Sequence, residues 1–210
     1  MHAWYFDVIS PFAYLQLQRM EELAAFGEIE AVPIVLGAVL QHCGQLGPAE
    51  IPSKRKFAYP FIDFVARKAG YPIRFPPTHP FNPLAALRLI CAVNPEQRWA
   101  MTRAVFAHIW RDGLLADSAE ALQAVALQFG INDAQAACSD PMVKAQLKQN
   151  TERAIAAGVF GVPSLQLGNE LFWGFDSTDY ALHVMQHPNY FDAPLVQHLR
   201  KMPASVVRAR

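Results

Sequence analysis

Apolar positions near the start of the chain predict a strand followed by a helix. The run Ala3–Ile9 is apolar except for one aspartate, and a short run of this kind before a turn predicts a buried strand at about residues 2–9. Ser10 and Pro11 then form a strong helix start, because serine caps free amides and proline fits the first helical position. Apolar residues recur at helical spacing after it and predict a helix from Phe12 to Phe26.

The middle of the chain changes from this pattern to helices. Residues 29–36 predict a second buried strand, parallel to the first if the crossover is right-handed. Residues 37–52 are rich in Gly, Gln and Pro and predict a loop, and residues 71–83 hold five prolines and predict a surface loop. Helical spacing predicts helices at 54–68, 83–93, 95–112, 118–129, 132–138 and 140–157.

The end of the chain returns to strands. Residues 159–167 predict a strand preceded by a turn, and Gly168-Asn169 predicts a hairpin to Leu171–Trp173, because both residues tolerate positive φ. Residues 176–179 resemble a capping box before a last helix. The element order β-α-β, helical block, β-β-α predicts an α/β fold, with one domain from residues 1–36 and 155–210 and a helical insertion domain from 37–154.

Composition narrows the class of protein. The chain has 210 residues, of which 52% are hydrophobic and 17% charged, as in a folded domain with a core. Its net charge is zero and no basic stripe is present, so we expect no nucleic-acid partner. No apolar run has the length of a membrane helix and no secretion-signal pattern is present, which favours a cytoplasmic protein without a membrane partner.

The spacing of the cysteines and histidines argues against a disulfide framework, a dithiol centre and a metal site. The chain has three widely spaced cysteines and no Cys-x-x-Cys, which argues against a disulfide framework and a dithiol centre. Cys91 has a core pattern and Cys138 ends a predicted helix, whereas Cys43 is either an incidental loop thiol or a neighbour of a site. His183 and His187 have no evident third ligand, so we expect no metal.

Ser10 is the first candidate for chemistry, because it lies where a strand, a sharp turn and a helix start meet. A helix N-terminus in this place lowers the pKa of a thiol, but the chain supplies a hydroxyl. A thiolate used here therefore has to come from another molecule. Ser10 is either a helix cap only, or a cap that also donates a hydrogen bond to that thiolate.

Three motifs in this order resemble a known family; they are Phe6–Leu15, Phe160–Ser164 and Leu171–Asp176. The chain is similar to the DsbA-like branch of the thioredoxin superfamily that contains kappa-class glutathione transferases and 2-hydroxychromene-2-carboxylate isomerases. The resemblance spans nearly the whole chain. It implies a thioredoxin-like fold with a helical insertion, glutathione as cofactor, and a homodimer.

The resemblance also implies where glutathione binds. Ser10 would orient and stabilise its thiolate, and the backbone of Val162, before a cis Pro163, would pair with its cysteinyl backbone. From the sequence alone a plain turn with a trans bond is the alternative. Trp173, Gly174 and Phe175 would form the approach to the γ-glutamyl end.

At that end, the amide of Ser177 and its neighbours would receive the carboxylate, and Asp176 would pair with the ammonium. The alternative for Asp176 is a helix cap. Gln45 stands where the family usually has Asn and reaches farther. Lys54 either meets the glycyl carboxylate or is a solvated helix lysine.

The proline-rich loop would line the pocket for a second substrate, together with Phe12. His79 takes the place of a tyrosine in the isomerases and either binds a phenol or carboxylate or lies on the surface. Asn82 either binds substrate or caps a helix.

The function that the resemblance implies is interconversion of 2-hydroxychromene-2-carboxylate, a small aromatic carboxylate, and trans-o-hydroxybenzylidenepyruvate in naphthalene-type aromatic breakdown. A kappa-like transferase or peroxidase and a non-catalytic thioredoxin-like binding module are the alternatives. A dithiol oxidoreductase is disfavoured because the thiol pair is missing.

Overall fold

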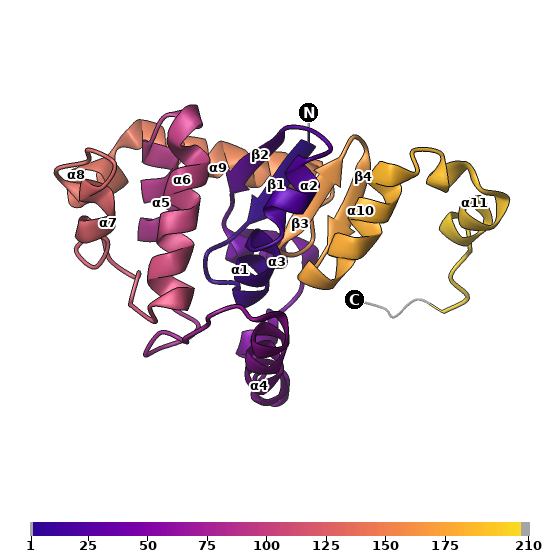
Figure 1. Ribbon diagram of the computed structural model, residues 1–210, viewed down its shortest axis with the longest axis horizontal. Helices are drawn as coiled ribbons and strands as arrows, with labels where there is room; N and C mark the ends of the chain where they lie inside the picture. The colour runs from indigo at the N-terminus through magenta and orange to yellow at the C-terminus, as the bar shows by residue number, and fades with distance from the viewer. Residues whose placement is uncertain (1, 207–210) are drawn as a thin grey trace.

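A four-stranded sheet with the order β2-β1-β3-β4 lies at the centre of the computed structural model, which describes residues 2–206 (Figure 1). The first two strands pair in parallel, and β3 runs antiparallel to β1 and β4. The predicted parallel opening and the closing hairpin are therefore confirmed. The strands are β1 (His2–Phe6), β2 (Ile29–Pro33), β3 (Ser164–Leu167) and β4 (Glu170–Trp173).

Most helices lie between β2 and β3 in the sequence, as the helical block predicts. The helices before and within this block are α1 (Pro11–Leu17), α2 (Met20–Ala24), α3 (Leu36–Cys43), α4 (Pro52–Ala69), α5 (Leu84–Ala92), α6 (Pro95–Phe106), α7 (Gln123–Leu127), α8 (Ala134–Ser139) and α9 (Pro141–Ala156). The helices after β4 are α10 (Thr178–Gln186) and α11 (Pro194–Arg200). Short turns of helix complete the chain: η1 (Pro48–Glu50), η2 (Ala107–Arg111), η3 (Phe175–Ser177) and η4 (Tyr190–Asp192).

Several predicted elements differ from the structure. The predicted loop at 37–52 is wrong, because α3 and η1 occupy most of it. Apolar residues recur there at helical spacing and Val39 is buried, but the Gly, Gln and Pro content hides the pattern. The predicted helix from Phe12 to Phe26 is two helices, since Arg19 leaves helical backbone angles (φ −108°, ψ 6°) and its guanidinium binds Glu22 and Asp179.

The strands are also shorter than predicted. β1 ends at Phe6 because the next residues form a turn, in which the Ser10 amide donates to Asp7 O at 3.1 Å. β3 begins only at Ser164, and the residues before it form a loop. This turn and this loop lie beside each other at one end of the sheet, since Ser164 pairs with Tyr5.

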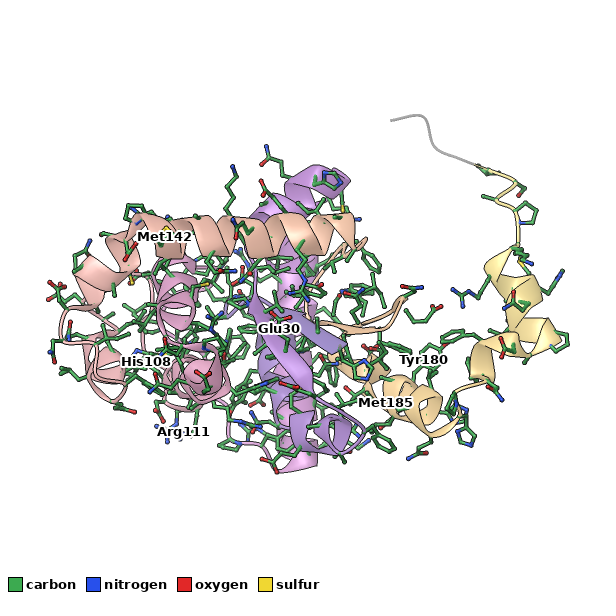
Figure 2. All side chains as sticks on the ribbon, turned by 90° about the horizontal axis from the view of Figure 1, so that it is seen from above. Glu30, His108, Arg111, Met142, Tyr180 and Met185 are labelled. Carbon is green, nitrogen blue, oxygen red and sulfur yellow. The ribbon has the colours of Figure 1, made fainter. Side chains whose placement is uncertain are left out.

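Alternation along β1 divides the core between the two faces of the sheet. Trp4 and Phe6 pack on one face, whereas Ala3 and Tyr5 pack on the other face in a cluster with residues of α3 and α9. Seen from above, α9 runs along one side of the sheet and α10 lies on the other (Figure 2).

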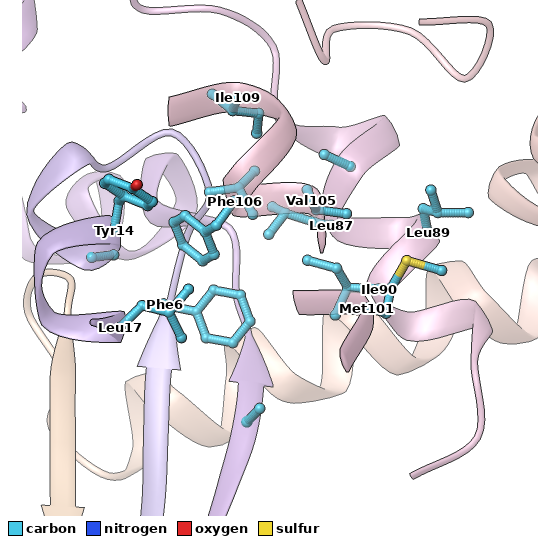
Figure 3. Close-up of a cluster of buried hydrophobic side chains, with 14 of the residues drawn as sticks. Phe6, Tyr14, Leu17, Leu87, Leu89, Ile90, Met101, Val105, Phe106 and Ile109 are labelled. Atoms are coloured by element: carbon cyan, nitrogen blue, oxygen red, sulfur yellow. The ribbon is translucent and has the colours of Figure 1, made fainter. Parts of the chain in front are cut away.

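The core of the helical block is continuous with the core under the sheet. Phe6 of β1 and Tyr14 of α1 lie in one buried cluster with Leu87 of α5 and Phe106 of α6 (Figure 3). The predicted division at residues 36/37 and 154/155 stays a prediction. Of the helices described, none is both long and apolar enough to cross a lipid bilayer.

Candidate active site

Ser10 is the N-cap of α1, as predicted. Its backbone is extended (φ −89°, ψ 113°), its Oγ accepts a hydrogen bond from the Ala13 amide at 3.3 Å, and Pro11 follows at the first helical position. A serine hydroxyl carries one hydrogen and two lone pairs, and the cap uses one lone pair. Within residues 2–206 no acceptor takes the hydroxyl hydrogen, so Ser10 can cap the helix and still donate to a bound group.

The residue before Ser10 is held from both sides. The Ile9 amide donates to Asp7 Oδ1 at 3.0 Å, and Ile9 O lies 2.8 Å from His79 Nε2. The other Asp7 oxygen accepts from the Leu36 amide at 2.9 Å. Burial raises the pKa of Asp7 to about 7, although both amide bonds pull it down. The sequence signal for Asp7 is a single carboxylate inside an apolar run, from which no role was predicted.

The second wall of the site is the loop before β3. The Val162–Pro163 peptide bond is cis, as the resemblance predicted. The Gly174 amide donates to Pro163 O at 2.9 Å and joins this loop to the end of β4. In the described part of the chain, neither the N–H nor the C=O of Val162 has a hydrogen-bond partner. Both groups are therefore available to an added strand of backbone.

The third wall is the segment after β4, and α1 holds it in place. Phe12 and Phe175 stack with ring centroids 5.4 Å apart. Gln16 Nε2 donates to Gly174 O at 3.1 Å, and Gly174 has a φ of 90°, which favours glycine. Trp173 is 54% exposed and packs on Phe160. The structure thus brings Ser10, Phe12, Pro163 and the β4 end together.

Two details of this segment differ from the prediction. Asp176 is not the cap of the last helix, and the capping box is wrong, because α10 begins at Thr178 after Ser177, whose side chain makes no cap bond. The Ser177 amide donates to Gly174 O at 3.2 Å and is occupied. In the described part of the chain, the amides of Phe175 and Asp176 are the ones here without a partner. The hydrogen bonds of η3 engage the amides of Ser177 and Thr178. The free amide donors are therefore those of Phe175 and Asp176, nearer to β4 than predicted.

A groove of about 420 Å³ lies between α1 and α4. Figure 1 shows α4 projecting from the body of the molecule below the sheet. Among the predicted residues, the groove brings Phe12 and Lys54 together, and its other lining is mostly apolar. The lining residues are Phe12, Pro48, Ser53, Lys54, Phe57, Ala58 and Phe61.

Gln45, His79 and Asn82 were also predicted to bind glutathione or substrate, and they do not line this groove. Gln45 is exposed just after α3. Asn82 is also exposed, and its Oδ1 accepts from the Leu84 amide at 3.1 Å, but the cap position of α5 is Pro83, so Asn82 is not the cap residue. His79 is half-buried rather than on the surface, and its Nδ1 lies 2.6 Å from the Tyr59 hydroxyl. Because Ile9 O occupies its other nitrogen, a bond from His79 to a substrate would have to break one of these contacts.

Burial disfavours the thiolate form at two of the three cysteines. The cysteines are free, and burial raises the pKa of Cys91 to about 11 and raises the pKa of Cys138. Cys43 ends α3. Within residues 2–206, no three His, Cys, Asp or Glu side chains come together as a metal site would require.

Comparison with known proteins gives one consistent relationship. A profile of the DSBA-like thioredoxin domain matches residues 3–186. The chain is 31% identical over 179 residues to the 2-hydroxychromene-2-carboxylate isomerase of Pseudomonas putida, which covers 82% of this chain and 88% of the relative. It is 25% identical over 174 residues to human glutathione S-transferase kappa 1, and this match covers 76% of this chain and 77% of the relative.

A solved structure agrees with these sequence matches. A 2-hydroxychromene-2-carboxylate isomerase superposes with a TM-score of 0.78 at 28% identity, covering 92% of this chain and 98% of the other. The predicted fold class, a thioredoxin-like α/β fold with a helical insertion, is confirmed.

Proposed function

The chain belongs to the DSBA-like thioredoxin domain family, and we propose that it is a glutathione-dependent isomerase that interconverts 2-hydroxychromene-2-carboxylate and trans-o-hydroxybenzylidenepyruvate. The observation that carries the proposal is Ser10, a buried serine whose Oγ caps α1 and whose hydroxyl hydrogen is free for a ligand. The isomerase relatives are named for this substrate, and the kappa transferase relative is less similar.

Ser10 and the start of α1 can supply the stabilisation that a thiolate needs. Lowering a thiol pKa from about 8.5 to about 7 takes about 2 kcal/mol. A helix N-terminus contributes about 0.3–1 kcal/mol, and a hydrogen bond to a charged group about 1.5–3 kcal/mol. The hydroxyl of Ser10 is therefore the larger contribution. No general base is needed in this account.

The surrounding walls match the remaining parts of a tripeptide. The free N–H and C=O of Val162 would pair with its cysteinyl backbone in the manner of an added strand. Lys54 would bind the glycyl carboxylate from the groove. At the other end, the amides of Phe175 and Asp176 would receive the γ-glutamyl carboxylate, with the Asp176 side chain near its ammonium.

The groove between α1 and α4 fits the aromatic substrate. Its lining includes the phenyl rings of Phe12, Phe57 and Phe61, which can pack against a fused ring. Bound glutathione would supply a nucleophile that adds to the conjugated substrate and leaves after bond rotation. Ser10 would hold the sulfur in its charged form, and the groove would hold the ring.

A kappa-like transferase or peroxidase is the second candidate, because it uses the same thiol site and differs in the second substrate. A non-catalytic binding module is the third, and it predicts no glutathione binding. The homodimer that the resemblance implies and the cytoplasmic location expected from the sequence belong to the proposal. Sedimentation and cell fractionation test them.

Calorimetric titration with glutathione, followed by an absorbance assay on the chromene acid, separates these candidates. The isomerase proposal predicts glutathione binding, isomerisation that depends on it, and no net consumption of glutathione. Conjugation of a chlorinated aromatic acceptor without isomerisation would instead favour the transferase. Absence of binding at millimolar glutathione would leave only the third candidate.

A further inference from the structure

The turn that presents Ser10 is bound by side chains from the helical block. Two successive carbonyls of the turn accept hydrogen bonds, Val8 O from Trp110 Nε1 and Ile9 O from His79 Nε2, each at 2.8 Å. The His79 and Trp110 rings also contact each other edge to face, with centroids 5.4 Å apart. The position of Ser10 therefore depends on two side chains that are distant in the sequence. His79 lies 70 residues after Ile9, and Trp110 lies 102 residues after Val8.

His79 also connects this turn to α4. Its Nδ1 lies 2.6 Å from the Tyr59 hydroxyl, which also donates to His79 O at 2.9 Å. Because a carbonyl only accepts, Nε2 carries a proton and donates to Ile9 O, so Nδ1 of the neutral ring is an acceptor. The single hydrogen of the Tyr59 hydroxyl is then shared between Nδ1 and His79 O. Burial lowers the pKa of His79 and the nearby Arg55 charge acts in the same direction, whereas the hydrogen bond to Ile9 acts against them. The net shift of the pKa is downward, which favours the neutral ring.

The two hydrogen bonds of His79 reach two different parts of the proposed site. Ile9 directly precedes Ser10, whereas Tyr59 lies on the same helix as Lys54 and next to Ala58 of the groove. Tyr59 packs in one cluster with Phe12 and Phe175. A ring that binds both parts fixes the distance between the hydroxyl of Ser10 and the wall that α4 provides.

We propose that His79 is a positioning residue, which aims Ser10 through Ile9 O and holds α4 through Tyr59 without touching the substrate. The proposal rests on the proposed function, since it assigns to His79 the placement of the thiolate site. Its two bonds are separable. The Ile9 bond governs the stabilisation of the bound thiolate, and the Tyr59 bond governs the closeness of α4 and thus the affinity for glutathione.

Substitutions at His79 separate the two bonds. His79→Gln places an amide nitrogen near the position of Nε2 and should keep the bond to Ile9 O. The side chain of His79→Asn is too short to reach Ile9 O. His79→Phe keeps an aromatic ring but loses both hydrogen bonds. The ultraviolet absorbance of the thiolate reports the pKa of bound glutathione. We expect this pKa to rise by about one unit in the Phe and Asn variants, with a fall in kcat of about tenfold at neutral pH, and to return to within about 0.3 units in the Gln variant.

Tyr59→Phe tests the second bond. We expect the pKa of the bound thiol to stay as in the wild type, and KM for glutathione to rise about two- to fivefold with little change in kcat. Tyr71→Phe is a matched control, because Tyr71 packs in the same cluster and its hydroxyl has no hydrogen-bond partner among the described residues. KM should not change in the control.

His108→Phe is the matched control for His79. His108 Nε2 lies 2.8 Å from Leu115 O, so its loss removes the same kind of bond within the helical block. Figure 2 shows His108 among the helices of that block, away from Glu30 of β2. A merely structural role of His79 predicts that both Phe variants lose stability and that neither changes the thiol pKa.

The outcomes distinguish the inference from the proposed function. The inference is overturned if the wild type lowers the pKa of the bound thiol and this pKa stays equally low in His79→Phe and His79→Asn. It is also overturned if His108→Phe raises this pKa as much as His79→Phe does. If His79→Phe does not fold, the comparison of Asn with Gln decides, and equal thiol pKa values in these two overturn it. Failure of the wild type to bind glutathione overturns the proposed function and the inference together.

Discussion

The ring of Phe12, two residues after Ser10, lies stacked on the ring of Phe175, with centroids 5.4 Å apart and planes inclined by 8°. This contact joins the first turn of α1 to the segment after β4. The candidate thiolate site and the candidate γ-glutamyl site are therefore fixed relative to each other by an apolar contact inside the chain.

Phe12→Leu and Phe175→Leu should each destabilise the protein, and the double variant should show coupling. We expect an interaction free energy of about 0.5–1.5 kcal/mol from urea unfolding, because stacked rings contribute about this much beyond burial. The pair Phe57 and Phe61 is the control, since these rings also stack but are 70% and 37% exposed. Equal coupling in both pairs would contradict a special role for the contact between Phe12 and Phe175, which are both half-buried.

Ser10→Ala should lower turnover more than it lowers glutathione affinity. It removes the cap, at a cost of about 1 kcal/mol of stability, and it removes the donor to the thiolate, which should cut kcat about 10- to 100-fold. Steady-state kinetics with varied glutathione measure both effects. Ser10→Thr should retain most activity because it keeps a hydroxyl.

Asp133→Ala is the control that separates the loss of a helix cap from the loss of the hydrogen bond that Ser10 would donate to the thiolate. Asp133 caps α8 through a 2.8 Å bond from the Ala136 amide, so its loss costs a similar stability without touching the site. Activity should remain as in the wild type. If Asp133→Ala and Ser10→Ala lose activity equally, the role assigned to the Ser10 hydroxyl is wrong.

Asp7 should make stability fall as pH rises. Its pKa is about 7 in the folded chain against an ordinary 3.8, so between about pH 4 and pH 7 the folded state holds a proton that the unfolded state lacks. Raising the pH through this range favours unfolding, by up to about 1.4 kcal/mol per pH unit. Urea unfolding at several pH values should show this slope in the wild type, and Asp7→Asn should remove it.

His79 acts with the opposite sign in part of the same range. Its pKa is lowered by burial, so below about pH 6.5 the unfolded state binds the extra proton and stability falls with falling pH. A comparison made in the His79→Gln background removes this contribution. Parallel curves for the wild type and Asp7→Asn would contradict the buried carboxyl account.

Lys54→Gln should raise KM for glutathione and leave kcat nearly unchanged. An exposed ion pair contributes about 0.2–1 kcal/mol, which corresponds to a rise of about 1.4- to fivefold in KM. The effect should shrink with added salt. Lys56→Gln is the control, because Lys56 is exposed on the same helix but does not line the groove. The same rise in KM for both variants would indicate a general charge effect.

Local chemistry in the sequence predicted the start of α1. Ser10 and Pro11 carry a cap signal that needs no distant partner, and the structure keeps it. The parallel opening pair and the closing hairpin followed in the same way from apolar runs and the hairpin signal, whereas the pairing of β1 with β3 was not predicted. By contrast, α3 was missed because its Gly and Gln content hides an apolar spacing that becomes decisive only when Val39 is buried.

The contacts of Asp7 and His79 could not be predicted in this way. Asp7 binds the amide of Leu36, and His79 binds the carbonyl of Ile9, a partner 70 residues away. Such pairings depend on tertiary packing, for which a single sequence carries no local signal. The cis bond at Pro163 was predicted only through the family resemblance, since most X-Pro bonds in folded proteins are trans.

The rate of isomerisation of 2-hydroxychromene-2-carboxylate as a function of glutathione concentration tests the central claim most directly. The account predicts no enzymatic turnover without glutathione, a saturable rise as it is added, recovery of all the glutathione at the end, and a plateau lowered by Ser10→Ala. Turnover that is the same with and without glutathione would contradict the account.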